Sequence, residues 1–464
     1  MITISRSLVR RLRIAFARGL GAKVRKHVPS VQVQTGDRGI FVRAKNDRCA
    51  IAFHMPGTFE AHRFALPFEA LKQCEGPKSE EVTLTTTDRE VVLQWIASRV
   101  PQSVRFPLKD AEDFPPLPDQ MESNSSHLLD ALREAVAVAS DENTRYALDH
   151  LQLRGDRGQV VATDGRQLLA QGGFSFPWDD DLLIPANRLF ASSDLGGHET
   201  VQIGTKEDWV VIRSGPWTLW GHVAKTARFP KLGDLLTPNR TNASALLLAD
   251  GDAAFLAEAV ERLPGNDASN SPVTVDLNGS VAIRSQGAGD AQPTEIVLTN
   301  SRRDGDAISW STHREHLRRA ARLGFRRIGV VDQEAPICCQ DEDRIYVWAS
   351  LGTYGLVSSS TDAIRIESPT RDTKRSTQAN QPQSTERNTS MIKSNSQSSE
   401  KHEETADQQS VNDMLEAAEA LKGSLRQALA DTYVLIAGLK KQRKQSKILR
   451  SAVMSLRQLR GIDA

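Results

Sequence analysis

Apolar residues recur at two different spacings along the first three quarters of the chain. Between residues 128 and 139, five apolar side chains lie on one helical stripe, the spacing of an amphipathic helix. The run Val160–Thr163 leads into Asp164-Gly165 and then a second apolar pair, and this order indicates a hairpin because a tight turn needs a positive φ angle. With a second short helix expected at 188–190, the pattern predicts an α+β unit in which two helices cover one face of an antiparallel sheet.

An internal repeat runs through this part of the chain. The segment Asp113–Asp119 recurs as Arg228–Asp234, and the apolar runs at 81–84 and 91–93 recur at 200–203 and 210–212. A third unit shows the same order, with helices expected near 252–263 and 312–323 and strands near 328–331 and 345–348. A repeat of this length indicates one structural unit repeated along the chain. We therefore predict three domains, at residues 1–120, 121–240 and 241–366.

The last quarter of the chain has a different composition. Ser, Thr, Gln and Asn supply 23 of the 41 residues from Thr370 to Ser410, and such a segment cannot bury enough apolar surface to order itself. We predict a disordered linker at 367–410. Apolar residues in 411–464 then follow a 4-3 spacing typical of a coiled coil, with a basic run across the middle. Two interpretations stay open: a solvated helix face, or a pairing element that also contacts a polyanion.

Charge and composition exclude several classes of protein. With 59 Lys and Arg against 58 Asp and Glu, the net charge is +1, which excludes a uniformly basic nucleic-acid coat. No apolar run is long enough for a membrane span and no secretory signal is visible, so we expect a cytoplasmic protein. The four cysteines include no C-x-x-C pair and are expected to be reduced and structural.

The sequence contains little that points to catalysis. A phosphate-binding loop, a dinucleotide fingerprint, a nucleophile elbow and an H-E-x-x-H pair are all absent from the sequence. Asp179–Asp181 has no partner carboxylate nearby, and the pair His313 and His316 has arginines around it that would repel a cation. We therefore predict no enzyme activity, no metal and no cofactor.

Basic residues are concentrated on particular segments. Residues 1–30 carry eight Lys and Arg and no acidic residue, and residues 314–327 carry six Arg against Glu315 alone. Arg314, Arg318 and Arg322 are spaced i, i+4, i+8 and form one stripe on a helix. Such stripes suit phosphate contacts, which need many cations and no base-edge geometry. Ordinary solvated helix faces are the alternative interpretation.

The second unit carries a specific resemblance. The stretch Asp141–Leu148 (DENTRYAL), followed by Val160–Leu168 (VVATDGRQL), is similar in order and spacing to the middle domain of the bacterial sliding clamp, the β subunit of DNA polymerase III. Arg228–Pro230 resembles the RFP that closes that domain, and Ile345–Trp348 resembles the last strand of the family. The resemblance covers residues 1 to about 353. It implies a homodimer whose two chains close head-to-tail into a ring around DNA.

The resemblance also implies two sets of site residues. For DNA binding it implies Lys23, Arg25, Arg145 and Tyr146, to which the charge pattern adds Arg10, Arg11, Arg18, Arg318 and Arg322. For a pocket that binds peptides of DNA polymerase III and the clamp loader it implies Leu148, Thr163, Gly165, Arg166, Gln167, Leu168, Pro230, Asp234, Leu235, Val347, Ala349, Ser350, Leu351 and Gly352.

Several pocket positions depart from the family pattern. The usual His-Arg pair is Arg166-Gln167, a usual basic position is Asp234, and the terminal MPMR is replaced by Ala349–Gly352. Loss of two Met side chains removes flexible apolar lining.

Together these features predict a non-catalytic DNA sliding clamp, a processivity subunit for replication, with an added tail. Whether it is a housekeeping clamp or a paralogue stays open. The alternative is a clamp-like scaffold that works through its coiled-coil tail without encircling DNA.

Overall fold

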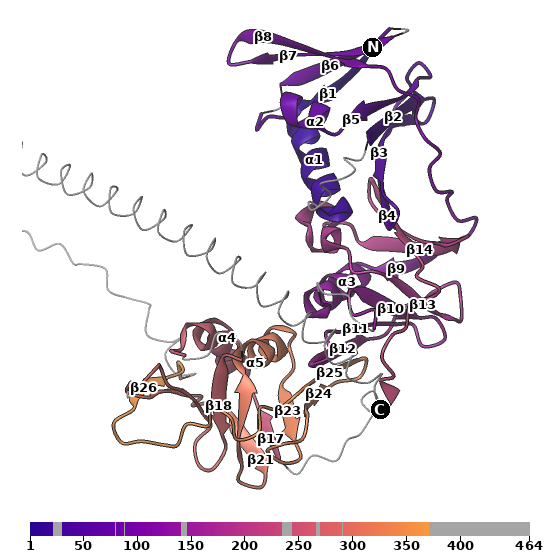
Figure 1. Ribbon diagram of the computed structural model, residues 1–464. Helices are drawn as coiled ribbons and strands as arrows, with labels where there is room; N and C mark the ends of the chain where they lie inside the picture. The colour runs from indigo at the N-terminus through magenta and orange to yellow at the C-terminus, as the bar shows by residue number, and fades with distance from the viewer. Residues whose placement is uncertain are drawn as a thin grey trace, which may run out of the picture. The chain divides into compact units, whose positions relative to one another are not determined.

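The computed structural model describes residues 1–21, 30–78, 80–87, 89–140, 146–233, 244–265, 270–289 and 291–370 (Figure 1). Residues 371–464, with most of the predicted linker and all of the predicted coiled coil, lie outside the described residues. The described part contains three units with the same order of elements, which confirms the predicted α+β fold. The predicted domain boundaries stay predictions, and the units are defined below by their elements.

The first unit runs from β1 to β8. Its first helix begins after Ser5, whose hydroxyl accepts a hydrogen bond from the backbone N–H of Leu8 at 3.2 Å, and ends at Gly21, where φ is +79°. A serine cap and a left-handed glycine are the ordinary signals for these two ends. The elements are β1 (Ile2–Ser5), α1 (Arg6–Leu20), β2 (Ser30–Gly36), β3 (Gly39–Lys45), β4 (Cys49–Met55), β5 (Arg63–Pro67), α2 (Glu69–Cys74), β6 (Glu81–Thr86), β7 (Glu90–Ala97) and β8 (Val100–Pro107).

The second unit confirms the two local predictions made for it. The predicted helical stripe lies along α3, with its three leucines buried, Val136 half-buried and Ala139 at the C-terminal cap. The predicted hairpin joins β11 to β12, with Gly165 at φ +88° and Asp164 accepting from the N–H groups of Arg166 and Gln167. The expected second helix is a short 3₁₀ turn. The elements are β9 (Glu122–Ser125), α3 (His127–Val138), β10 (His150–Arg154), β11 (Gln159–Thr163), β12 (Gln167–Gln171), β13 (Asp181–Pro185), η1 (Arg188–Ala191), η2 (Ser193–Leu195), β14 (Thr200–Lys206), β15 (Trp209–Ser214) and β16 (Trp217–His222).

The third unit has the two predicted helices and the strands predicted near 328–331 and 345–348. Compared with the other two units it has two additional strands: β21 (Arg302–Gly305), at the edge of its sheet, and β26 (Ile364–Glu367), which follows the last strand that the sequence predicts. The other elements are β17 (Ser244–Leu247), α4 (Asp250–Ala259), η4 (Val260–Arg262), β18 (Pro272–Asp276), β19 (Ala282–Ser285), β20 (Thr294–Val297), β22 (Ser309–His313), α5 (Arg314–Arg322), β23 (Arg327–Val330), β24 (Ile337–Gln340) and β25 (Arg344–Trp348).

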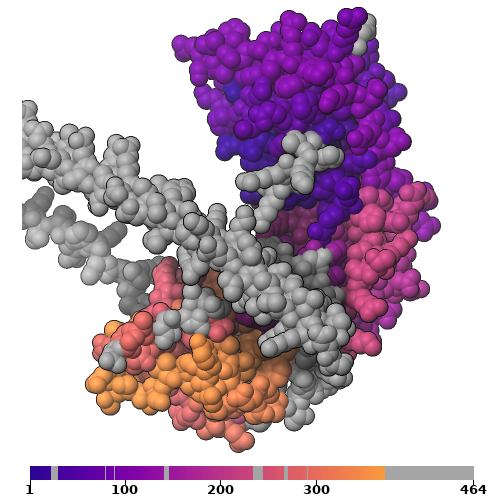
Figure 2. Space-filling view, in the orientation of Figure 1, coloured from indigo at the N-terminus to yellow at the C-terminus, as the bar shows by residue number. Residues whose placement is uncertain are grey.

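Consecutive units are joined through the edges of their sheets. Strand β4 of the first unit pairs antiparallel with β16 of the second, and β12 of the second unit pairs antiparallel with β25 of the third. The four sheets have the strand orders β1-β6-β7-β8, β5-β2-β3-β4-β16-β15-β14-β9, β13-β10-β11-β12-β25-β24-β23-β17-β21 and β22-β18-β19-β20-β26. Figure 2 shows the first unit in contact with the second.

The apolar faces of helices and sheets form the core of each unit. Trp217, Trp310 and Trp348 are among the largest fully buried side chains, and Phe16 of α1 meets Trp217 edge-on across the first joint. All four cysteines are buried and free, and burial raises the pKa of the Cys49 thiol to about 11. None of the described helices is long and apolar enough to cross a membrane.

Candidate nucleic-acid interface and peptide site

The basic residues of α1 divide into two groups. Arg10, Arg11 and Arg18 are exposed; the Arg11 guanidinium lies 2.9 Å from an Asp194 carboxylate oxygen, and Arg18 donates to the Ser192 hydroxyl at 3.3 Å. Arg6 and Arg13 instead form ion pairs with acidic residues beside α2. Arg11 and Arg18 therefore lie next to η1 and η2 of the second unit, and all three predicted DNA contacts of α1 are exposed.

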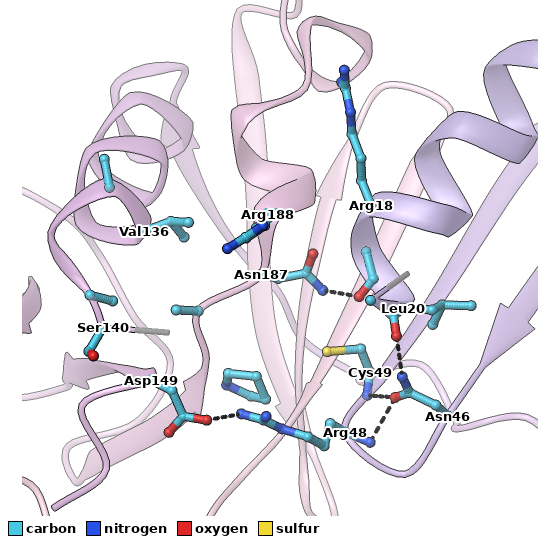
Figure 3. Close-up of a pocket in the computed structure, with 16 residues that line it drawn as sticks. Arg18, Leu20, Asn46, Arg48, Cys49, Val136, Ser140, Asp149, Asn187 and Arg188 are labelled. Carbon is cyan, nitrogen blue, oxygen red and sulfur yellow. Dashed lines mark hydrogen bonds and ion pairs between the residues drawn. The ribbon is translucent and has the colours of Figure 1, made fainter. Parts of the chain in front are cut away.

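A cleft of about 470 Å³ lies between the end of α1 and η1 (Figure 3). Arg18, Arg48 and Arg188 line it, together with the carboxylate of Asp149. Arg48 donates to Asp149 at 2.8 Å, and Arg188 points into the cleft. Arg18 lines the cleft but extends away from Asp149 to Ser192, so the guanidinium groups of Arg48 and Arg188 are the ones that lie toward the cleft (Figure 3). They make it a candidate seat for phosphate, since arginine presents several donors to a planar or tetrahedral anion.

Two asparagines fix the geometry of the cleft. The last carbonyl groups of a helix have no partner within the helix. Asn187 donates to the Gly19 carbonyl at 3.0 Å and Asn46 donates to the Leu20 carbonyl at 3.0 Å, so side chains from both units satisfy the end of α1. A Cβ atom at Gly19 would lie 2.3 Å from the Cδ1 methyl of Ile51, so glycine allows the close approach of α1 to β4 without a shift of the Ile51 side chain.

The charge on Asp149 is also fixed by its neighbours. Burial raises the pKa of this carboxyl, but the contacts with His150 and Arg48 outweigh burial and lower it below its ordinary value. Asp149 is therefore ionised at neutral pH and holds Arg48 at the cleft wall.

Some of the predicted DNA contacts lie outside the described residues. These are Lys23 and Arg25, in the segment 22–29, and Arg145, in the segment 141–145. Gly21 and Ser140, which directly precede these two segments, both line the cleft. Tyr146 is described and 38% exposed.

The arginine stripe of α5 is largely occupied by protein partners. Arg314 donates to the backbone carbonyls of Leu263, Pro264 and Ser271, and burial lowers its pKa. Arg318 donates to the Ala257 carbonyl and pairs with Glu261 and Glu315. Arg322 is exposed. The predicted contact at Arg318 stays a prediction, but the structure shows that this side chain stabilises the third unit.

Most of the predicted peptide pocket comes together where β11, β12 and β25 adjoin. Leu168 lies opposite both Thr163 and Val347 in the sheet, and the backbone N–H of Ala349 donates to the Arg166 carbonyl at 2.8 Å. A Cβ atom at Gly165 would lie 3.9 Å from Leu148. Phe229 and Leu232 pack over this sheet on either side of Pro230 in the chain. Asp234 and Leu235 lie outside the described residues.

Three predicted pocket residues follow a different path. The N–H of Leu351 donates to the Ser311 carbonyl at 3.0 Å, the N–H of Ser311 donates to the Gly352 carbonyl at 3.3 Å, and Ser350 donates to the Gln333 carbonyl at 2.6 Å. Residues 350–352 therefore run along β22 of the third unit and are not paired with β12.

Gln167 connects the second and third units through its side chain. Its carbonyl oxygen accepts from the Arg319 guanidinium at 2.6 Å and from the Tyr346 hydroxyl at 2.8 Å, and its amide donates to Asp164 at 2.9 Å. This side chain is satisfied inside the joint rather than presented to a peptide.

Sequence reasoning missed Arg48 and Arg188 in the cleft and Phe229 and Leu232 over β12. A lone arginine after a turn has no sequence pattern that marks it as a phosphate contact. Phe229, in contrast, is part of the repeated segment and could have been included in the predicted peptide pocket. In the described ranges, no three His, Cys, Asp or Glu side chains are grouped so that they could hold a metal ion.

Comparison with known proteins identifies the fold. No protein-family model matches the sequence, and no curated protein matches it. Among solved structures, the DNA polymerase sliding clamp from Bacillus subtilis matches with a TM-score of 0.61 and 14% identity over 76% of this chain and 99% of that chain. The DNA polymerase III β subunit from Pseudomonas aeruginosa matches with a TM-score of 0.59 and 17% identity, over 75% and 99% of the two chains. The β subunit from Thermotoga maritima matches with a TM-score of 0.58 and 14% identity, over 75% and 98%. The three-unit body of this chain thus has the fold of the bacterial sliding clamp, the β subunit of DNA polymerase III, in a divergent sequence.

Proposed function

We propose that this protein is a non-catalytic DNA clamp, in which two chains close head-to-tail into a ring around duplex DNA. The main observation behind this proposal is that the same kind of joint occurs twice. Strand β4 pairs with β16 and β12 pairs with β25, and each pairing links one unit to the next. In the first unit, β8 is the edge strand of the sheet β1-β6-β7-β8. A further joint of the same kind between two chains would complete a closed cyclic assembly.

The placement of charge supports DNA as the encircled partner. Arg10, Arg11 and Arg18 and the cleft formed with Arg48 and Arg188 present guanidinium groups on the helical side of the first joint. Guanidinium groups at this site suit phosphates, which carry no sequence information. Such contacts are weakened by salt, so retention by a clamp has to come from topology rather than from affinity.

We also propose that the clamp tethers a polymerase through the junction of β11, β12 and β25. Leu168 and Val347 lie side by side there, and Phe229 and Leu232 add apolar surface. A short linear peptide from a polymerase or a clamp loader is the partner that such an apolar site suits.

Retention on circular DNA tests the proposed function. Full-length protein would be mixed with nicked circular duplex and passed over a sizing column in 0.3 M salt, before and after the circle is cut once. A clamp co-elutes with circles and is lost after cutting, since it slides off the ends. Equal retention on both forms would mean ordinary electrostatic binding, and absence from both would favour the scaffold alternative.

A further inference from the structure

The chain continues past β25 and returns to the third unit as an extra strand. Strand β26, which Figure 1 labels in the third unit, pairs parallel with β20, with Thr294 opposite Ile364 and Val297 opposite Glu367. The N–H of Ile364 donates to the Pro293 carbonyl at 2.8 Å, and the N–H of Ser368 donates to the Val297 carbonyl at 2.9 Å. We call residues 357–369 the strap.

Both ends of the strap are fixed by hydrogen bonds. At its start, the N–H of Val357 donates to the Thr274 hydroxyl at 2.8 Å. At its end, Ser368 is 3% exposed, and its hydroxyl donates to the carboxylate of the fully buried Asp252 at 2.7 Å. Asn300 donates to the Pro369 carbonyl at 3.0 Å. The strap is therefore anchored to the third unit by specific contacts and not by the pairing with β20 alone.

The strap occupies the position of a joint between units. Three sheets contain the equivalent runs β5-β2-β3-β4, β13-β10-β11-β12 and β22-β18-β19-β20. In the first two, the next strand is the last strand of the following unit, β16 or β25. In the third, the next strand is β26. By the same rule, the strand that belongs beside β20 is β8, the last strand of a first unit, supplied by a second copy of the chain.

The sequence of β26 resembles that of β8. Ile364-Arg365-Ile366 and Val104-Arg105-Phe106 are both an arginine between two apolar residues, and this order reads the same in both chain directions. The Arg365 guanidinium lies 3.8 Å from the carboxylate of Glu295 on β20. The two strands therefore offer β20 the same pattern of side chains.

The pairing of β26 leaves apolar surface uncovered. Ile364 is 50% exposed and Ile366 is 42% exposed, whereas Val104 and Phe106 of β8 are partly buried against the core of the first unit. In a second copy bound at β20 through β8, Val104 and Phe106 would keep their packing against the core of their own unit, so this joint would leave less apolar surface exposed than β26 does.

We infer that β26 is a displaceable strap that competes with β8 of a second copy for the edge of β20. This inference rests on the proposed ring and gives the strap a role in ring closure. The strap covers the edge of β20 in the single chain, and that edge must be freed before two chains join. Edge strands are covered in this way in many proteins, because an open edge pairs with other chains.

Two substitutions in the full-length chain test the competition. Ser368→Pro removes both the N–H bonded to Val297 and the hydroxyl bonded to Asp252. Arg365→Glu places a like charge against Glu295 and keeps the backbone bonds. Ser359→Pro, at an exposed residue of the strap, and Arg365→Lys are the matched controls. Sedimentation velocity from 0.1 to 50 µM would give the dimer dissociation constant of each chain, and circular dichroism would confirm folding.

We expect both test variants to dimerise roughly tenfold or more tightly than the unmodified chain, because a larger fraction of each variant has the edge of β20 free for a second copy. Both controls should leave the dimer dissociation constant unchanged. Unchanged dimerisation of both test variants would overturn the inference. Weaker dimerisation would also overturn it, since β26 would then itself form the joint. Retention on nicked circles separates the two proposals. Unchanged dimerisation of the variants together with retention of the unmodified chain removes the strap and leaves the clamp intact, whereas chains that dimerise and are never retained refute the clamp.

Discussion

Substitution of Asp252 should release the strap and loosen the start of α4. Its carboxylate accepts four hydrogen bonds: from the backbone N–H of Asn300 at 3.0 Å, the Asn300 side chain at 2.8 Å, the Ser301 hydroxyl at 2.6 Å and the Ser368 hydroxyl at 2.7 Å. Asp252 is fully buried. Asp252→Ala removes the acceptor of four hydrogen bonds at a fully buried position, although the Asn300 side chain keeps its bond to the Pro369 carbonyl.

The magnitude follows from these contacts. A hydrogen bond to a charged group contributes about 1.5–3 kcal/mol, but the hydroxyls of Ser301 and Ser368 can turn toward other acceptors, so the four do not add. We expect a loss of roughly 3–5 kcal/mol in the local opening free energy. Asp252→Asn keeps one acceptor oxygen and should lose about half as much.

Hydrogen exchange on the full-length chain measures this opening directly. A loss of 3 kcal/mol corresponds to roughly a hundredfold faster exchange of the amides in β26. The control is Asp250→Ala: Asp250 lies in the same first turn of α4 but its side chain is 87% exposed and pairs with Arg326 at 2.7 Å. Such a surface pair contributes about 1 kcal/mol or less. Equal exchange in the two alanine variants would refute the role given to Asp252.

The same site predicts a pH dependence. Burial raises the pKa of Asp252, but the hydrogen bonds from Ser301, Ser368 and Asn300 outweigh burial and lower it below the ordinary value. A carboxyl with a lowered folded-state pKa contributes its stability above its unfolded pKa and loses it as the pH falls through the folded pKa. Exchange in β26 should therefore be constant from pH 7 to 5, after correction for the intrinsic rate, and should accelerate below about pH 4.

Three further predictions concern the cleft, the third unit and the second joint. Reversing Arg18 and Arg188 to Glu should lower the slope of log affinity against log salt by about 2, at about 0.9 per lost phosphate contact, in fluorescence anisotropy with short linear duplex. Burial lowers the pKa of His316 to about 4, so the unfolded chain takes up a proton before the folded chain as the pH falls below 6.5, and urea unfolding of the third unit should show a loss of roughly 2 kcal/mol from this group between pH 7.5 and 5. The loss should be smaller in His316→Gln, where only the neighbouring His313, whose pKa burial also lowers, contributes. Gln167→Ala leaves the buried Tyr346 hydroxyl without its acceptor and should cost about 1–3 kcal/mol in urea unfolding.

Matched variants control for these effects. Arg38 and Arg157 are exposed and do not line the cleft, so their reversal should lower the salt slope less than that of Arg18 and Arg188, and an equal effect would contradict the cleft. Gln152 donates to Asp181 at an exposed position, and its change to Ala should cost under about 0.5 kcal/mol. A loss at Gln152 as large as at Gln167 would remove the special role of the joint.

Local signals predicted much of the fold because they act within a few residues. The Asp164-Gly165 turn and the stripe of α3 are set by neighbours in the sequence, and both are present. Strand β26 could not be predicted in this way: it has four residues, follows a polar run, and pairs with β20, which comes much earlier in the chain. Its place depends on Asp252 and Ser368, whose contact exists only after folding.

The candidate site was harder to predict than the fold. The exposed arginines of α1 follow from helical spacing, but the same spacing on α5 gave Arg318, which bonds to the Ala257 carbonyl and to Glu261. Spacing shows which residues share a face and not whether that face meets solvent or a neighbouring backbone. Arg48 and Arg188 belong to different units and meet at the cleft through the joint of β4 with β16.

The lifetime of single labelled molecules on linear DNA tests encirclement most directly. Full-length and Ser368→Pro proteins would be placed on duplexes whose two ends are either free or blocked by bulky tethers, and followed in 0.3 M salt. A ring around DNA should stay far longer on blocked duplexes than on free-ended duplexes, and its lifetime on blocked duplexes should change little with salt. Equal lifetimes on the two kinds of DNA for both proteins would contradict encirclement.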